Sequence, residues 1–597
     1  MSSWFTIPPS ERGASLHEQL VSATTQRLAG RPAAPGVARG PWSEVGRVPL
    51  PAPRLIEPAD VRAELARLRA AAIESAHELR AMAESVKAAG HEPEAAIFGA
   101  QALMARDPDL LDAAAHEIEG ARTDAATAVM RAARATAATI AALADERLRA
   151  RAADILDVAD RIARHVLGLA VDTELRTPAV LVAEDLPPSI TATLPRDRLL
   201  GIVLEGSSPT AHAAILARAY GIPAVVGASG VLAAAPTAGP GEQIALDGAT
   251  GEVVLAPDAA DGASFDDRAA QAARARALDL AEATVAAATV DGVEIALLAN
   301  IGGPDEALGA VALGASGVGL FRTEFLFLER SSPPSEAEQV DAYRTVVEAF
   351  HGNPVTIRLL DVGGDKPIPY LPLAREDNPF LGVRALRLAA DRPDLFVTQL
   401  RACHRAATAG PVRVMAPMVA DGTDAQVLVD LAARARDSLV AEGVAFGPIE
   451  LGVMLEIPSA ILTAGSYFDR IEFASLGTND LLQYTLAVDR GNAALERYRD
   501  SLHPAQLRLI RMAVEAAAER GVSLSVCGEM AGDPVAALAL IGLGIRSLSM
   551  VAPSLPGVRR TIRHVDAAQL AAEAEAACFD DSAAAVRTRF GRFAGGA

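Results

Sequence analysis

ELGVMLEI, residues 450–457, is one of eight apolar runs in the second half of the chain, and it carries a carboxylate, Glu456, at its end. The other seven runs are VEIALLANI (293–301), SGVGLF (316–321), VTIRLLDVG (355–363), VRVMAPMV (412–419), FASLG (473–477), LSVCGE (524–529) and SLSM (547–550). Strands that are apolar throughout are typical of parallel strands buried on both faces, and each interval has room for a helix. The pattern therefore predicts a (β/α)8 barrel, or TIM barrel, over residues 290–597.

Two other kinds of sequence precede the predicted barrel. Residues 56–169 are rich in Ala, Leu, Arg and Glu with helical periodicity, which is typical either of a plain structural bundle or of a helical domain that binds a partner. Short strand candidates flank them, namely PGVARG (35–40) before and AVLVAEDL (179–186), GIVLEG (201–206), IPAVVGA (222–228) and EVVLAPD (252–258) after. We therefore expect an α/β domain formed by residues 28–55 and 170–260, with the helices as an insertion.

The remaining segments complete an α/β multidomain organisation. Residues 261–289 form a charged, Ala-rich stretch that we interpret as a helical linker, and residues 1–27 are a polar N-terminal extension to which we assign no structure. A length of 597 residues is about four times the ~150 residues of one typical domain, which agrees with several domains.

Composition excludes several classes of function. The net charge of −20 argues against a protein that binds nucleic acid through the phosphate backbone. The first residues lack the pattern of a signal peptide, and no apolar run approaches the ~18 residues needed to span a bilayer, so we expect no membrane insertion. Three scattered cysteines fit neither a disulfide framework nor a zinc site. We therefore expect a cytoplasmic protein.

Charged residues recur where the predicted barrel strands end, and this is where a barrel builds its active site. Glu456 and Asp480 are 24 residues apart, about one βα repeat, so their carboxylates would project into the same mouth. Two hard oxygen donors suit Mg²⁺. The chain carries arginines in the same segments, at Arg322, Arg358, Arg384 and Arg490, and a guanidinium group can bind phosphate and carboxylate oxygens in a fork.

A single residue of this kind is more often a helix cap or a surface ion pair. In combination, the residues predict a site for a small phosphorylated acid.

Two further residues have both a structural and a functional interpretation. Cys527 is either a buried core cysteine or a thiol at the barrel mouth that exchanges a proton with a substrate carbon. His212 precedes an apolar helical run, where it is either a capping histidine or a nucleophile whose phosphate would be stabilised by the helix N-terminus.

Longer motifs around these residues resemble a known family. They are GVGLFRTEFLF (317–327), RLLDVGGDK (358–366), NPFLGVRALR (378–387), GVMLEIP (452–458), SLGTNDLLQYTLAVDRGN (475–492), VCGEMAGD (526–533) and, upstream, TAHAAILARAYGIPAVVG (210–227). The chain resembles Enzyme I of the bacterial phosphotransferase system, among the enzymes that use phosphoenolpyruvate, from about residue 28 onwards.

The resemblance implies an enzyme that phosphorylates its own histidine from phosphoenolpyruvate, releases pyruvate and passes the phosphoryl group to the phosphocarrier protein HPr for sugar uptake. It implies that His212 is the phosphorylated residue and that Cys527 protonates the enolate. The residues that would bind phosphoenolpyruvate are Arg322, Arg358, Arg384, Asn479 and Arg490, and those that would bind Mg²⁺ are Glu456 and Asp480.

The resemblance also implies roles for the domains. The α/β domain would be a swivelling phosphohistidine domain, the helical insertion 56–169 would dock HPr, and the barrel would bind phosphoenolpyruvate and form a homodimer.

One departure from the family pattern lies next to His212. The family usually has two glycines, a variable residue and Thr-Ser-His, whereas this chain has Ser207, Ser208, Pro209, Thr210 and Ala211 before His212. Serine and proline restrict the backbone where glycine would not. This departure motivates an alternative, a paralogue that binds phosphoenolpyruvate as a regulator without turnover. A pyruvate phosphate dikinase or phosphoenolpyruvate synthase would need an ATP-binding domain, and no P-loop precedes His212.

Overall fold

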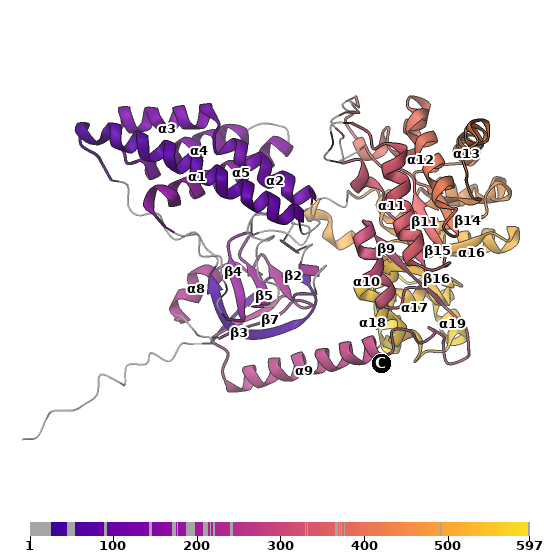
Figure 1. The fold of residues 1–597 in the computed structure, drawn as a ribbon. Coiled ribbons are helices and arrows are strands. Elements are labelled where there is room, and N and C mark those ends of the chain that lie inside the picture. The colour runs from indigo at the N-terminus through magenta and orange to yellow at the C-terminus, as the bar shows by residue number, and fades with distance from the viewer. Residues whose placement is uncertain are drawn as a thin grey trace, which may run out of the picture. The chain divides into compact units, whose positions relative to one another are not determined.

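The computed structural model describes residues 25–44, 54–88, 92–141, 146–169, 175, 177–186, 198–206, 213–214, 217–218, 221–238, 243–328, 330, 332–363, 368, 370–371, 373–374, 376–489 and 492–594. The chain folds as two compact units, Met1–Ala273 and Arg274–Ala597. Their strands and helices carry the labels of Figure 1.

The first unit contains a mixed sheet whose described strands follow the order β1-β8-β7-β3-β4-β5-β6-β2. The strands are β1 (Gln26–Ala29), β2 (Arg31–Ala34), β3 (Val37–Glu44), β4 (Ala179–Ala183), β5 (Leu199–Leu204), β6 (Ala224–Val226), β7 (Gln243–Asp247) and β8 (Glu252–Leu255). β4 is buried along its whole length and β5 at all but one residue, which agrees with their content of Val, Leu and Ile. A helix, α8 (Val231–Ala238), follows β6.

Strands from both sides of the helical segment pair in this sheet. β3, which precedes the helices, is parallel to β4, which follows them, and antiparallel to β7. The helices α1 (Val61–Ala88), α2 (Glu92–Met104), α3 (Pro108–Gly120), α4 (Ala125–Ala141) and α5 (Glu146–Leu167) lie between β3 and β4 in the sequence. They bury a core of their own that includes Leu68, Ile118, Val129 and Ile162.

The four strand candidates expected after the helices correspond to β4, β5, β6 and β8. The sequence pattern did not predict β1, β2 or β7. β1 begins at Gln26, inside the last two residues of the expected extension 1–27. A long helix, α9 (Ala259–Ala281), occupies most of the segment interpreted as a linker.

The second unit is a closed barrel of eight parallel strands, which confirms the predicted fold class. The strands are β9 (Ala296–Ile301), β10 (Val318–Phe321), β11 (Val355–Arg358), β12 (Val412–Ala416), β13 (Ile449–Leu455), β14 (Phe473–Leu476), β15 (Ser523–Val526) and β16 (Ser547–Val551). All eight apolar runs form strands of this barrel, and β16 pairs with β9 to close it.

Helices cover the barrel (Figure 1). They are α10 (Ala307–Ala312), α11 (Glu336–Ala349), α12 (Pro393–Ala406), α13 (Gly422–Glu442), α14 (Pro458–Leu462), α15 (Thr478–Leu486), α16 (Pro504–Arg520), α17 (Pro534–Gly542), α18 (Leu555–Ile562), α19 (Ala567–Ala577) and α20 (Ala583–Ala594). Local sequence sets several boundaries. Ser335 and Glu338 form a capping box at the start of α11, and α13 is capped at its C-terminus by Gly443, whose φ of 67° is left-handed.

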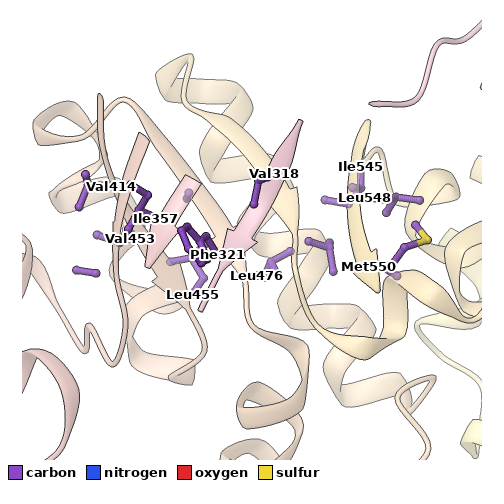
Figure 2. Packing of buried hydrophobic residues seen from close by; sticks show 14 of the residues in the cluster. Val318, Phe321, Ile357, Val414, Val453, Leu455, Leu476, Ile545, Leu548 and Met550 are labelled. Carbon is purple, nitrogen blue, oxygen red and sulfur yellow. The ribbon is translucent and has the colours of Figure 1, made fainter. Parts of the chain in front are cut away.

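The main core lies between the outer faces of the strands and the helices. Figure 2 shows part of it, with Val318, Val414, Val453, Leu476 and Leu548 contributed by five different strands. Because side chains alternate along a strand, the neighbours of these residues face the inside of the barrel, and in β10 a register irregularity after Val318 places Leu320 there. A second, smaller cluster of Leu320, Met415, Met454, Phe473 and Cys527 fills part of that interior. Within the described residues, we find no helix that is both long enough and apolar enough to cross a membrane.

Candidate active site

Arg358 ends β11 and lies at the carboxyl end of the barrel among carboxylates. Its guanidinium donates to Glu324 Oε1 at 2.7 Å and lies 3.3 Å from Asp361 Oδ2. Burial alone would lower the pKa of Arg358, but Glu324, Asp361 and Glu456 together raise it above its usual value. The Nε–H of this arginine is buried and has no hydrogen-bond partner among the residues that the structure describes. An unsatisfied buried donor is costly, so a site that binds an anion is a natural explanation.

Arg384 connects Asp361 with Asp480. Its Nη2 contacts both oxygens of Asp361 at 2.9 Å and lies 3.6 Å from Asp480 Oδ2. Its Nη1 donates to the hydroxyl of Tyr484 at 3.4 Å, and that hydroxyl donates to the carbonyl of Phe380 at 2.8 Å. Burial, followed by the charge of Asp480, raises the pKa of Tyr484 to about 12. Arg384 is therefore fixed on three sides.

Glu456 follows β13 and is only 2% exposed. Its Oε1 accepts the backbone N–H of Met418 at 2.7 Å. Burial first, and then the carboxylates of Asp480 and Asp361, raise the pKa of Glu456 above its usual range. Several carboxylates thus share a buried space, an arrangement that a bound cation would stabilise.

Asn479 and Asp480 lie in the first turn of α15, directly after β14. The side-chain oxygen of Asn479 accepts the backbone N–H of Glu529 at 3.1 Å, which ties this turn to the segment after β15. Gly477, the residue before the helix, passes close to Glu456. A Cβ built on Gly477 would lie 2.9 Å from Oε2 of Glu456, so only glycine allows this approach.

Cys527 directly follows β15 and is 2% exposed, inside the barrel. Its thiol donates to the carbonyl of Leu476 at 3.6 Å. Burial is the main cause that raises the pKa of Cys527 to about 11, while Ser475 and the charges of Arg358 and Arg322 lower it. The thiol is therefore protonated at neutral pH, which is the state that a proton donor needs.

Arg322 follows β10 and its side chain is exposed. Its charge acts on both Cys527 and Glu306, so it lies on the same side of the barrel as the other arginines. Seven of the nine predicted site residues are thereby brought together at the carboxyl ends of the strands. They are Arg322, Arg358, Arg384, Glu456, Asn479, Asp480 and Cys527. His212 and Arg490 lie outside the described residues, as do residues 207–211 of the unusual loop.

Sequence reasoning did not assign roles to several residues that hold this site together. Gln399 of α12 is fully buried, donates to the hydroxyls of Thr323 and Tyr343 at 3.0 and 3.1 Å, and accepts the N–H of Leu360 at 2.9 Å. It thereby clamps the turn that carries Arg322 to the turn that follows Arg358. A glutamine in the middle of a helix carries no sequence signal for this role.

The carboxylates fit a hard divalent cation that takes few protein ligands. Glu456 and Asp480 are acidic, buried and close enough to interact. Among the described residues, we find no group of three His, Cys, Asp or Glu side chains arranged for a metal. A site of two carboxylates whose remaining ligands are water and substrate oxygens is the usual form for Mg²⁺.

A cavity of about 570 Å³ lies beside this cluster. Its lining includes Phe380, Leu381, Met418, Ile457, Tyr484 and Val488. Met418 and Tyr484 also contact site residues, because Met418 donates its N–H to Glu456 and Tyr484 accepts from Arg384.

Comparisons with known proteins agree with this architecture. Three family models match: "PEP-utilising enzyme, N-terminal" over 29–151, "PEP-utilising enzyme, mobile domain" over 175–251, and "PEP-utilising enzyme, PEP-binding domain" over 276–567. The last covers nearly all of the barrel and its site residues.

Curated relatives match over most of their length. A phosphoenolpyruvate-protein phosphotransferase of Streptomyces coelicolor is 45% identical over 93% of this chain and 96% of its own. The protein of the same name from Geobacillus stearothermophilus is 41% identical over 85% of this chain and 87% of its own. The one from Bacillus subtilis is 38% identical over 84% of this chain and 88% of its own. The chain therefore belongs to the phosphoenolpyruvate-protein phosphotransferase family, which confirms the resemblance seen in its motifs.

Proposed function

We propose that this protein transfers the phosphoryl group of phosphoenolpyruvate to His212 and from there to the phosphocarrier protein HPr, in the uptake of sugars. The observation that supports this most is the buried cluster of Arg358, Arg384 and carboxylates at the barrel mouth, in which the Nε–H of Arg358 lacks a partner among the described residues. The names of the relatives support the same reaction.

In this proposal the substrate is held by its phosphate and carboxylate oxygens. Arg322, Arg358, Arg384, Asn479 and Arg490 are the side chains that bind it. Arginine suits this task because its planar fork matches both oxyanions. Fixed in place by Asp361 and Tyr484, Arg384 presents its charge without having to reorganise.

Glu456 and Asp480 would hold Mg²⁺. The ion would supply a charge that offsets the negative charge of the transferring phosphoryl group. The two carboxylates orient it, and the N–H of Met418 fixes Glu456 in turn.

The chemical step is an in-line transfer. A nitrogen of the His212 imidazole attacks phosphorus, the bond between phosphorus and the enol oxygen breaks, and the enolate of pyruvate is left in the barrel mouth. The protonated thiol of Cys527 then gives its proton to carbon 3 of the enolate, and pyruvate leaves.

Further parts of the proposal concern partners and location. The α/β domain carrying His212 swivels between the barrel and the carrier, the helical segment 56–169 docks HPr, and the barrel forms a homodimer. We place the protein in the cytoplasm, where its three cysteines, all described, free and buried, would remain reduced. The alternative is a regulatory paralogue that binds phosphoenolpyruvate without turnover, motivated by Ser207, Ser208 and Pro209.

The deciding experiment is incubation of the purified protein with Mg²⁺ and ³²P-labelled phosphoenolpyruvate, followed by addition of HPr. The proposal expects acid-labile, base-stable label that passes to HPr, and loss of the label in His212→Ala. His116→Ala, which removes an exposed histidine of α3, is the matched control and should label fully. Substrate binding without any label would favour the regulatory paralogue, and label that survives in His212→Ala would refute the assignment of the histidine.

A further inference from the structure

The interior of the barrel is polar along three neighbouring strands. Ser475 of β14, Ser523 and Ser525 of β15, and Ser547 and Ser549 of β16 alternate with residues of the outer core, such as Leu476 and Leu548 in Figure 2. Alternation places these five serines on the inner face. Barrel interiors are dominated by branched apolar side chains, so a set of serines here calls for an explanation.

Two of these serines form a chain that leads to Cys527. Ser475 and Ser525 are paired across the ladder between β14 and β15, and the hydroxyl of Ser525 donates to the hydroxyl of Ser475 at 2.9 Å. Cys527 lies two residues beyond Ser525, on the same inner face. The Ser475 hydroxyl lies close enough to the Cys527 thiol to lower its pKa. The three groups therefore lie in order on the inner face, with the hydroxyl of Ser525 donating to that of Ser475, which lies near the sulfur.

The chain leads from an exposed residue to buried ones. Ser523, at the amino-terminal end of β15, is exposed, and Ser525 is half-buried. Ser475 is 0% exposed and Cys527 is 2% exposed. Water therefore reaches the first hydroxyls from the end of the strands opposite to the substrate, whereas the thiol itself is enclosed.

The other groups that act on the thiol belong to the substrate side. Glu456, Arg358 and Arg322 are the charged side chains that influence Cys527, and each has a role there in binding metal or substrate. A bound substrate would separate the thiol from water at the mouth. The serines offer a route by which protons can reach the thiol while substrate fills the site.

We propose that Ser525 and Ser475 form a proton relay that restores the Cys527 thiol through the barrel interior. The proposal rests on the function proposed above. When the S–H bond breaks, its proton forms the C–H bond at carbon 3 of the enolate and leaves a thiolate. The proton of Ser475 then passes to sulfur, the proton of Ser525 passes to Ser475, and bulk water with its buffer returns a proton to Ser525. Each turnover consumes one solvent proton, and no oxidant or reductant is needed.

Two isotopes measured together test the relay. The protein is incubated in D₂O with Mg²⁺, phosphoenolpyruvate and ¹⁴C-labelled pyruvate, without a carrier. Movement of ¹⁴C into phosphoenolpyruvate reports phosphoryl transfer in both directions, which needs no net solvent proton. Deuterium at carbon 3 of phosphoenolpyruvate reports exchange of the thiol hydrogen with solvent. The informative quantity is the ratio of deuterium incorporated to carbon exchanged.

Threonine and valine at position 475 make a matched pair, since they have nearly the same shape and differ in the hydroxyl. In Ser475→Val we expect this ratio to fall about tenfold or more, and in Ser475→Thr we expect it to stay within about twofold of the unmodified protein. If Ser475 had only a structural role, the ratio would fall alike in both variants. An unchanged ratio in Ser475→Val would overturn the relay and assign proton supply to the mouth.

A second pair, Ser525→Val and Ser525→Thr, covers the case in which the enclosed position 475 tolerates neither side chain. Ser525 is half-buried and should accept both. We again expect the ratio of deuterium incorporated to carbon exchanged to fall about tenfold or more in Ser525→Val and to stay within about twofold in Ser525→Thr. An equal ratio in the two variants would contradict the relay. Complete absence of ¹⁴C exchange in the unmodified protein would instead contradict the proposed function itself, so the two failures are distinguishable.

Discussion

Arg384 holds Asp361 through two nitrogens, since Nη2 lies 2.9 Å from each carboxylate oxygen and Nε donates to Oδ1 at 3.2 Å, and the same carboxylate lies 3.3 Å from Nη1 of Arg358. One buried acid thus orients two arginines, one at the end of β11 and one in the long segment between β11 and α12. Three ionic groups in contact inside a protein depend on each other, since removal of one leaves the others buried and unpaired.

Asp361→Asn tests this dependence. It removes one charge and leaves the shape of the side chain, so both arginines lose their common partner. We expect the free energy of unfolding of the barrel to fall by about 3–5 kcal/mol. Urea unfolding followed by circular dichroism measures it. Asp437→Asn, which removes an exposed pairing with Arg436, is the control and should change stability by less than about 1 kcal/mol. Equal effects of the two changes would contradict a structural role for Asp361.

Gln399→Leu should disturb two substrate-binding turns at once. The change leaves the N–H of Leu360 without its acceptor, at about 1–3 kcal/mol, and it removes the amide that donates to the hydroxyls of Thr323 and Tyr343. We expect lower stability together with a raised KM for phosphoenolpyruvate. Thermal unfolding and steady-state kinetics measure the two effects. Gln426→Leu, on the exposed face of α13, is the control. An unchanged KM would show that the clamp does not position the arginines.

Gly477→Ala should damage the site through Glu456. The added Cβ would lie 2.9 Å from Cβ and Oε2 of Glu456, so either the strand end or the carboxylate must shift, at about 1–3 kcal/mol. We expect weaker activation by Mg²⁺ in a protein that still folds. Titration of activity with Mg²⁺ measures it. At Gly465 an added Cβ meets no atom within 4 Å, so Gly465→Ala should leave the titration unchanged.

The Cys527 thiol should ionise only at an unusually high pH. Its pKa of about 11, raised mainly by burial, lies above the ~8.5 of a free cysteine. The folded protein therefore retains this proton where an unfolded chain loses it, and the resulting stability, full below about pH 8.5, is lost as the pH rises towards 11. Thiolate absorbance in the difference between the unmodified protein and Cys527→Ser measures it. At pH 10 we expect about a tenth of the thiol to be ionised, and near-complete ionisation at pH 9 would contradict the burial argument.

Removal of divalent cations should stop labelling from phosphoenolpyruvate, because Glu456 and Asp480 are proposed to hold Mg²⁺. Full activity in excess chelator would refute that assignment. Glu456→Gln keeps the hydrogen bond from Met418 possible but removes a charge, so we expect it to lower the apparent affinity for Mg²⁺.

The sequence predicts the barrel well because buried parallel strands are mainly apolar. Leu451 to Leu455 in β13 is an example. The missed strands of the first unit have no such run. In β2, RPAA contains a proline and two alanines, and its pairing with β6 depends on residues nearly 200 positions away. Short strands of this kind are determined by their partners.

The sequence likewise predicts one part of the site and misses another. Strand-end charges such as Arg358 and Glu456 are visible in sequence because a barrel gathers strand ends in one place. Gln399, Tyr484 and Asn300 were not assigned, since their importance comes from contacts across the fold. Asn300, at the end of β9, donates to the carbonyls of Cys527 and Ser549. Spacing along the chain cannot reveal a hydrogen bond between residues 227 positions apart.

The described side chains at the barrel mouth oppose four carboxylates, Glu324, Asp361, Glu456 and Asp480, to three guanidinium groups, those of Arg322, Arg358 and Arg384. The mouth therefore does not carry a simple positive charge. An anionic substrate must replace these carboxylates as the partner of the arginines in order to bind. Substrate alone adds further negative charge to this site, whereas a divalent cation that binds with it offsets part of that charge. The two should thus increase each other's affinity by the same factor, a reciprocal coupling built into the charge balance of the strand ends.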